Sequence, residues 1–405
     1  MKKVNKPNKF RLLLVLIIPF LIFLTIAVAK SDKSQNPPAP TISEPTSKNL
    51  ETIRKITIDI NDKCKTEPAT CYEEAARRQL LDKYETREIL AAIYDFDKYY
   101  SCHAFTHFLG RALYKKIGSI PDAYSQVDFT CHGGTYHGVL EAFLDERKTT
   151  IDEISGKELA QICADSPTKA KKSQDQIITE CFHGYGHAFM FITESDLPKS
   201  LAYCDKLDPI YQERCWGGTF MENSTSSTNI DHPTQWLKAD DKFYPCTILE
   251  SRYLAQCYFY QANYLLKETN RDWNRVFLDC QELKDTTPHD YCILGMGAQL
   301  ASVSNEQGIS VAASVCQKAP NQDDAYICIE GAVPSLFARY GGDTPQIHEF
   351  CQKVTLFLRE FCFAKLGSVA KTYWQYDRPK LQEICNKTRQ YQNACLEGTE
   401  RDFKY

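Results

Sequence analysis

Residues 51–405 are predicted to form one all-α solenoid of disulfide-stapled helical hairpins, and three observations lead to this fold class. Cysteines recur in pairs with a period of about 35 residues, prolines precede three of these pairs by a constant distance, and no alternating strand pattern stands out. A repeat of this length is typical of stacked helical hairpins. The composition agrees with a folded chain, because 43% hydrophobic residues are enough to build a core.

The N-terminus predicts a membrane anchor that precedes the fold. Residues 1–11 are basic and carry no acid, and residues 12–29 form an uncharged apolar run. A helix of this length spans about 27 Å, enough for a bilayer core, and the positive tail is expected to stay in the cytoplasm. We therefore expect a single-pass protein of the cell membrane whose bulk is extracytoplasmic. The alternative is a signal peptide cleaved at Ala29, which would make the protein secreted.

A linker is expected between this anchor and the folded domain. Residues 30–50 are rich in proline, serine and threonine, a composition that favours an extended chain. Export also exposes the chain to an oxidising compartment. Disulfide bonds are therefore the expected use of the 18 cysteines.

Six successive cysteine pairs define the repeat, with 10 to 12 residues between the members of each pair. These pairs are Cys204–Cys215, Cys246–Cys257, Cys280–Cys292, Cys316–Cys328, Cys351–Cys362 and Cys385–Cys395. Pro198, Pro345 and Pro379 each lie six residues before a first cysteine. Proline suits the first turn of a helix, so a short first helix is expected to end near the first cysteine. The second cysteine is expected to open the second helix, and each disulfide then joins the two helices of one hairpin.

The same logic extends upstream with less regular spacing. It predicts the pairs Cys64–Cys71, Cys102–Cys131 and Cys163–Cys181. The resulting array of eight or nine hairpins resembles tetratricopeptide-type arrays in its architecture, although the residue signatures of those families are absent from the chain.

Six of the nine histidines lie between residues 103 and 187, on three neighbouring second-helix segments. They form the pairs His103/His107, His132/His137 and His183/His187. The first and third pairs are spaced i, i+4, so each shares one helix face. The middle pair is spaced i, i+5, which turns its rings about 140° apart on a helix, and Glu141 restores the i, i+4 spacing to His137.

If the repeats stack, these second helices lie side by side and their histidines converge. His107, His137 and His187 would then point into one zone with Glu222 of the next repeat. The second tier would consist of His103, His132 and His183. Imidazole and carboxylate ligands suit Zn, Cu, Fe or Mn, and we predict that the six histidines bind such a metal, or else a non-covalent haem.

Three further side chains are candidates for the chemistry of this site. Glu141 or Glu222 is expected to be a fourth ligand or a general base, where the metal activates water or dioxygen. Arg111 is expected to pair with a haem propionate or an anionic substrate. The structural alternatives are a salt bridge for Arg111 and simple packing between helices for the histidines.

Several common chemistries are excluded by the motifs that the sequence lacks. There is no His-Glu-x-x-His motif of zinc proteases and no Cys-x-x-Cys-His motif for covalent haem. Among the clustered histidines, Glu-x-x-His occurs once, at Glu180/His183, whereas the ferritin-like di-iron site needs two copies. A net charge of −4 and a pI near 6.2 argue against a nucleic-acid partner.

Two functions remain open from the sequence. The first is an exported protein with a metal or haem site within residues 102–222, with or without hydrolytic or redox activity. The second is a non-enzymatic scaffold at the cell surface that binds a protein partner on the repeats, with residues 246–405 as its main surface.

Overall fold

The computed structural model describes residues 47–94, 101–166, 174–225, 230–340, 342 and 345–401. By its internal contacts the chain divides into residues 1–44 and residues 45–405, and all described residues belong to the second unit. The predicted tail and anchor, residues 1–29, lie outside the described residues. Within the described part, no helix has the length and apolar character needed to cross a bilayer. The predicted linker overlaps the first helix, which begins at Ser47.

All regular structure in the described ranges is helical, and no strand occurs there. The fold class all-α is therefore confirmed. The α-helices are α1 (Ser47–Cys64), α2 (Ala69–Ala75), α3 (Thr86–Ile93), α4 (Cys102–Ile117), α5 (Ile120–Tyr124), α6 (Gly134–Asp145), α7 (Gly156–Asp165), α8 (Gln174–Ile192), α9 (Leu197–Cys204), α10 (Pro209–Thr225), α11 (Leu254–Glu268), α12 (Trp273–Gln281), α13 (Thr286–Ala298), α14 (Leu300–Gln307), α15 (Ile309–Ala313), α16 (Gln322–Arg339), α17 (Pro345–Lys353), α18 (Leu356–Tyr373), α19 (Arg378–Asn386) and α20 (Gln392–Glu400).

Nine disulfides connect the 18 cysteines. The bonded pairs are the nine that the spacing predicts, and in the described ranges no cysteine is left free. The predicted role of proline is also confirmed. Pro198 and Pro379 occupy the first turns of α9 and α19, and Pro345 opens α17.

In four of the six regular repeats the second helix begins six residues, more than one and a half turns, before the predicted start. The second helix begins at Pro209, Thr286, Gln322 and Leu356, each six residues before the cysteine of that helix. Polar residues outside the cysteine pattern start these helices. In α16, for example, the Asn321 side chain accepts a hydrogen bond from the backbone N–H of Asp324. In three of these repeats the disulfide therefore joins the end of a first helix, at Cys204, Cys280 or Cys351, to the second turn of the next helix.

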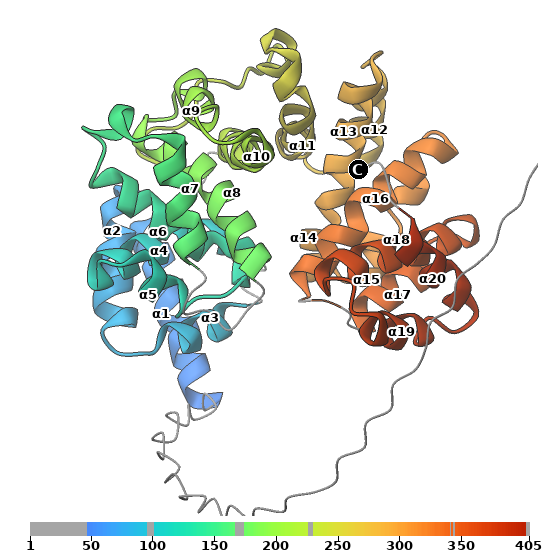
Figure 1. The fold of residues 1–405 in the computed structure, drawn as a ribbon, viewed down its shortest axis with the longest axis horizontal. Helices are drawn as coiled ribbons and strands as arrows, with labels where there is room; N and C mark the ends of the chain where they lie inside the picture. Colours follow the sequence, from blue (N-terminus) through green and yellow to red (C-terminus); the bar gives the residue numbers. More distant parts are fainter. Residues whose placement is uncertain are drawn as a thin grey trace, which may run out of the picture. The chain divides into compact units, whose positions relative to one another are not determined.

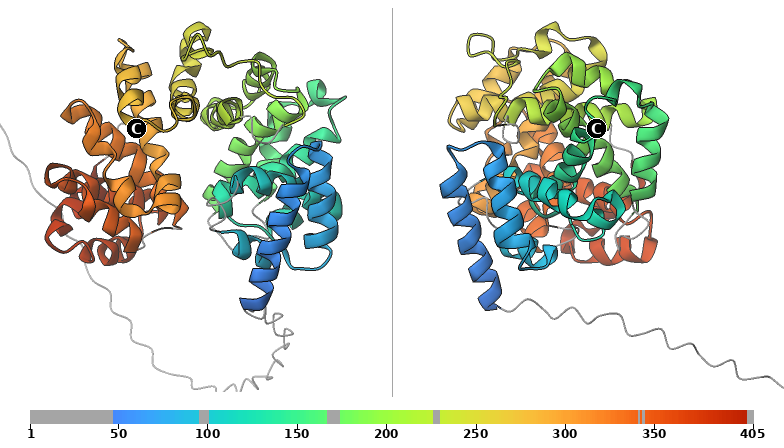
Figure 2. Two further views of the ribbon diagram at one scale, coloured as in Figure 1. Left: turned by 180° about the vertical axis from the view of Figure 1, so that it is seen from behind. Right: turned by 90° about the vertical axis from the view of Figure 1, so that its left-hand side faces the viewer.

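The second helices pack against one another in chain order. The most extensive contacts between elements join α4 to α6, α6 to α8, α8 to α10, α11 to α13, α13 to α16 and α18 to α20. Figure 1 shows this succession, and Figure 2 shows it from behind and from one side. The shorter first helices, such as α9 and α19, pack against the second helix of their own pair.

Glycine allows these helices to approach closely. A Cβ atom added at Gly138 of α6 would lie 2.0 Å from the carbonyl oxygen of His107 in α4. One added at Gly218 of α10 would lie 1.9 Å from the carbonyl oxygen of His183 in α8. Only residues without a side chain fit at such crossings. The first crossing brings the backbones of α4 and α6 into contact and the second those of α8 and α10, which positions the site described next.

Candidate metal centre

Four histidines from three consecutive second helices converge on one point. His103 and His107 come from α4, His137 from α6 and His187 from α8. Each offers one ring nitrogen, and these four atoms all lie within 4.8 Å of one another. His107, His137 and His187 are fully buried, whereas His103 is partly exposed. The cluster forms because α6 packs against both α4 and α8.

The hydrogen bonds of α4 determine which ring nitrogens carry a proton. Nδ1 of His103 lies 2.8 Å from the carbonyl oxygen of Cys131, and Nδ1 of His107 lies 2.6 Å from Oε1 of Glu141. Carbonyl and carboxylate oxygens only accept, so both Nδ1 atoms carry the hydrogen in neutral rings. Both Nε2 atoms then carry lone pairs, and the two atoms face each other at 3.0 Å. In these tautomers a cation bound by both rings would make the contact favourable.

His187 repeats this arrangement on α8. Its Nδ1 lies 3.1 Å from Oε2 of Glu222 in α10, which leaves Nε2 as the inward lone pair. A carboxylate on the outer nitrogen is the usual support of a metal-binding histidine, because it holds the ring in one orientation and raises its basicity. His107 with Glu141 and His187 with Glu222 are two copies of this support.

His137 differs from the other three histidines, because its Nδ1 and not its Nε2 is the candidate metal ligand. Its Nε2 lies 3.2 Å from Oε2 of Glu180, so the proton belongs on Nε2. Its Nδ1 is buried and has no hydrogen-bond partner among the described residues. A buried ring nitrogen without a partner costs free energy in a folded protein, and a bound metal ion would satisfy it. The buried Nδ1 of His137 therefore supports a bound metal independently of the contact between His103 and His107.

A buried charge network supports the α4 side of the cluster. Arg111 is 1% exposed; its Nε donates to Oε1 of Glu73 over 2.7 Å, and its Nη1 donates to Oε2 of Glu141. Lys115 donates to the second oxygen of Glu73. Because a buried guanidinium needs a counter-charge, Glu141 is held as a carboxylate. Arg111 is thus engaged in the salt bridges that the sequence left as its alternative role.

The electrostatic surroundings keep the imidazoles neutral. Burial lowers the pKa values of His107, His137 and His187 well below the usual 6.5, and neighbouring histidines lower them further. Burial raises the pKa of Glu141, while Arg111 opposes this shift. A histidine binds metal only in its unprotonated form. The lowered pKa values therefore favour metal binding at neutral pH.

The predicted second tier is only partly formed. His183 lies one turn before His187, with its Nε2 3.3 Å from that of His187, and its ring centroid lies 5.2 Å from that of His137. His103 joins the four-histidine cluster instead of standing apart from it. His132 does not belong to the cluster, and its ring centroid lies 6.4 Å from that of His103.

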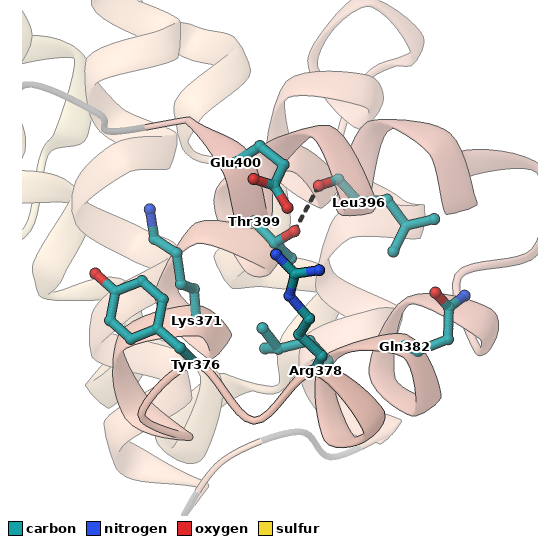
Figure 3. A pocket seen from close by; sticks show the side chains of 8 residues that line it. Lys371, Tyr376, Arg378, Gln382, Leu396, Thr399 and Glu400 are labelled. Carbon is teal, nitrogen blue, oxygen red and sulfur yellow. Dashed lines mark hydrogen bonds between the residues drawn. The ribbon is translucent and has the colours of Figure 1, made fainter. Parts of the chain in front are cut away.

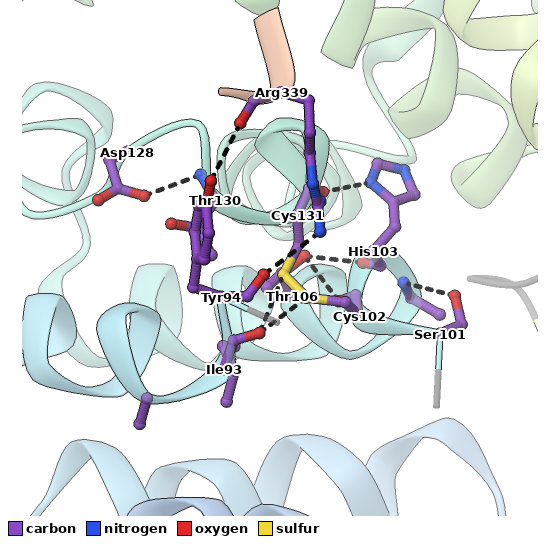
Figure 4. Close-up of a disulfide and its surroundings, with 12 residues drawn as sticks. Ile93, Tyr94, Ser101, Cys102, His103, Thr106, Asp128, Thr130, Cys131 and Arg339 are labelled. Atoms are coloured by element: carbon purple, nitrogen blue, oxygen red, sulfur yellow. Dashed lines mark hydrogen bonds between the residues drawn. A yellow bond between two sulfur atoms is a disulfide. The ribbon is translucent and has the colours of Figure 1, made fainter. Parts of the chain in front are cut away.

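The backbone before α6 explains the place of His132. Cys131, His132 and Gly133 have φ values of 55°, 56° and 73°, so the chain makes a left-handed turn before α6 begins at Gly134. The expected helical i, i+5 relation to His137 therefore does not apply. Figure 4 shows this turn beside the Cys102–Cys131 disulfide, with the carbonyl of Cys131 directed at the His103 ring.

Arg339, at the end of α16, lies close to the same turn although it is more than 200 residues away in the sequence. The Tyr94 hydroxyl donates to the carbonyl oxygen of Arg339 over 3.4 Å, and Nη2 of Arg339 donates to the carbonyl oxygen of Tyr94 over 3.3 Å (Figure 4). The end of α16 also packs on the turn at Thr130–Gly133. The later repeats thus contact the histidine-bearing region directly.

Two residues of the site were not assigned to it from the sequence. Glu180 lies three residues before His183 on α8, so the helical period would have placed it on the histidine face. Glu73 lies on α2, and no spacing relates it to Arg111. Its role depends on tertiary packing alone.

A second feature lies far along the chain from the cluster. A pocket of about 430 Å³ between α18, α19 and α20 is lined by Lys371, Tyr376, Arg378 and Glu400, among others (Figure 3). Its lining contains no histidine, and its residues come from none of the helices that hold the cluster.

Comparison of the chain with protein-family models, with curated proteins and with solved structures gives no match. The assignment of the site therefore depends on its own geometry.

Proposed function

We propose that this protein is an exported helical-repeat protein that binds a transition-metal ion through His103, His107, His137 and His187. The observation that carries the proposal is the convergence of four ring nitrogens within 4.8 Å of one another, on His103 and three fully buried histidines. The buried, unpartnered Nδ1 of His137 supports it.

The donor set favours some metals over others. Four imidazole nitrogens suit Zn, Cu or Fe, whereas Mn prefers sites richer in oxygen. The ring centroids of the four histidines lie between 4.6 and 5.7 Å apart, and such packing favours a bare ion over haem, which needs a wide slot between its ligands.

We assign Glu141 and Glu222 to orientation of the ligands. Each contacts Nδ1 of a histidine, on the far side of the ring from the inward nitrogen. This role differs from the fourth ligand or general base expected from the sequence. Such outer partners typically contribute about 10–100-fold in metal affinity.

The proposal includes a location and an architecture. Nine disulfides favour an oxidising compartment. We keep the proposal that residues 12–29 anchor the chain in the membrane and that the consecutive helix pairs form a solenoid. A protein partner on residues 246–405 also stays a proposal, and the exposed apolar side chains Leu356 and Phe357 at the start of α18 favour a contact there.

Elemental analysis tests metal binding. The full chain is produced in an oxidising compartment and purified without a histidine tag. We expect at least one equivalent of metal, and its loss in the double variant His107→Ala/His187→Ala. The control is His232→Ala, because His232 lies outside the cluster with half of its side chain exposed. A folded, metal-free wild type would contradict the proposal and favour the scaffold.

A further inference from the structure

We propose that the histidine cluster holds a second metal ion, bound by Glu180 and His183 on the solvent side of the first. This inference rests on the proposed function and extends it from one ion to two.

The two residues have the placement that a shared ion requires. They are spaced i, i+3 on α8, so their side chains lie on the same helix face. Both are partly exposed, and the Glu180 side chain retains 27% of its accessible surface. The ligands of the first ion are buried except for His103. Three of the four ligands of the first ion are thus fully buried, whereas both ligands of the second position are partly exposed.

Each of the two residues contacts a ligand of the first ion. Oε2 of Glu180 lies 3.2 Å from Nε2 of His137, and Nε2 of His183 lies 3.3 Å from Nε2 of His187. The second position therefore adjoins the first. Glu180 can keep one carboxylate oxygen on His137 and direct the other at the ion.

Gly133 leaves room for this carboxylate. A Cβ atom added at Gly133 would lie 2.8 Å from Oε2 of Glu180, and φ at this residue is 73°. Any side chain there would displace the carboxylate and strain the turn. The left-handed turn before α6 is thus matched to the place of Glu180.

The hydrogen bonds predict the order in which the two ions bind. In the metal-free protein Nε2 of His187 is a lone pair, because its Nδ1–H bonds Glu222, so His183 donates its Nε2–H to it. Once the first ion takes that lone pair, His183 loses its acceptor. Its proton then belongs on Nδ1, and Nε2 becomes a free ligand. We infer that the second ion binds only after the first.

The two positions differ in their chemistry. Four nitrogens close the coordination of the first ion, as in structural zinc sites. Two protein ligands leave the second ion with open positions for water. A divalent ion in such a site lowers the pKa of bound water and makes it a nucleophile at neutral pH. The second position is therefore the one suited to hydrolytic chemistry.

Metal titration tests the inference on the full chain. The protein is stripped with a chelator, titrated with Zn²⁺ and passed over a desalting column before elemental analysis. We expect two equivalents in the wild type and in the control His232→Ala, and one equivalent in His183→Ala and in Glu180→Gln. Circular dichroism checks that each variant is folded, and two different variants guard against a local folding defect.

Copper gives a second readout. Two Cu²⁺ ions in adjoining positions couple magnetically, so the integrated electron paramagnetic resonance signal should fall well below two spins per chain. His183→Ala loaded with Cu²⁺ should give the full signal of one isolated ion.

The outcomes separate this inference from the proposed function. One equivalent in the wild type, retained in both variants, overturns the second ion and leaves the first standing. Two equivalents that persist in both variants overturn the assignment to Glu180 and His183. A wild type that takes up no metal overturns both proposals.

Discussion

Nδ1 of His107 lies 2.6 Å from Oε1 of Glu141, and the other oxygen of the same carboxylate accepts a hydrogen bond from Arg111. Glu141 therefore serves a metal ligand and a buried cation at once. Glu222 contacts His187 in the same way, through one of its carboxylate oxygens. The two carboxylates form a natural matched pair for mutation.

Glu141→Gln and Glu222→Gln should have the same effect on metal binding, and Glu141→Gln should also be less stable than the wild type. Each removes the carboxylate behind one ligand, so metal affinity should fall about 10–100-fold in both. Glu141→Gln removes a counter-charge of Arg111, and breaking a buried ion pair costs about 3–5 kcal/mol. Competition with a chromophoric chelator and urea unfolding of the metal-free protein measure the two effects. Equal stability of Glu141→Gln and the wild type would show that Arg111 does not depend on Glu141.

Gly138→Ala should abolish metal binding by separating α4 from α6. The new methyl group would meet the carbonyl oxygen of His107 at 2.0 Å, so the helices must move apart. Gly295→Ala is the control, because its methyl group would meet the carbonyl oxygen of Phe259 at the same distance, between α13 and α11. Both variants should lose about 1–3 kcal/mol of unfolding free energy, but only the first should lose its metal. Retention of metal by Gly138→Ala would contradict the role of this crossing.

The disulfide between Cys102 and Cys131 should contribute to metal affinity in addition to the stability of the fold. Its members flank His103, and the carbonyl of Cys131 holds the His103 ring. Replacement of both cysteines by serine should weaken metal binding. The same replacement of Cys385 and Cys395 should leave it unchanged. Removal of either disulfide costs about 2–5 kcal/mol, so isothermal titration is best done well below the melting temperature. Equal loss of affinity in both variants would indicate a general effect of unfolding.

The stability of the metal-free protein should fall as the pH drops below about 6.5. Burial lowers the pKa values of His132 and His183 to about 3, whereas an unfolded imidazole titrates near 6.5. Between these values the unfolded chain binds more protons than the folded one, so the stabilisation present above pH 6.5 is lost on acidification. The loss is about 2 kcal/mol for each such histidine by pH 5. Urea unfolding at pH 7.5 and pH 5 measures it, and a smaller pH dependence in His183→Gln would identify one source.

The features of the fold that could be predicted from the sequence are those set by residues close to one another along the chain. Cysteine spacing gave the nine disulfides because each bond closes a short segment within or between neighbouring helices. The i, i+4 spacing placed His103 with His107 and His183 with His187 for the same reason.

Tertiary contacts and unusual backbone account for what the sequence did not reveal. The turn at Cys131 and His132 has positive φ in non-glycine residues, which side-chain patterns rarely indicate. The partners Glu73 and Glu180 depend on how α2 packs on α4 and α6 on α8. The choice of inward nitrogen on each histidine depends on hydrogen bonds that cross between helices.

X-ray absorption at the zinc edge tests the central claim most directly, with the full chain loaded with one equivalent of Zn²⁺. The account predicts a first shell of four nitrogens at about 2.0 Å with the multiple scattering of imidazole. The double variant His103→Ala/His107→Ala should lose this signal. A first shell that contains sulfur, or one of oxygen alone, would contradict a site made by His103, His107, His137 and His187.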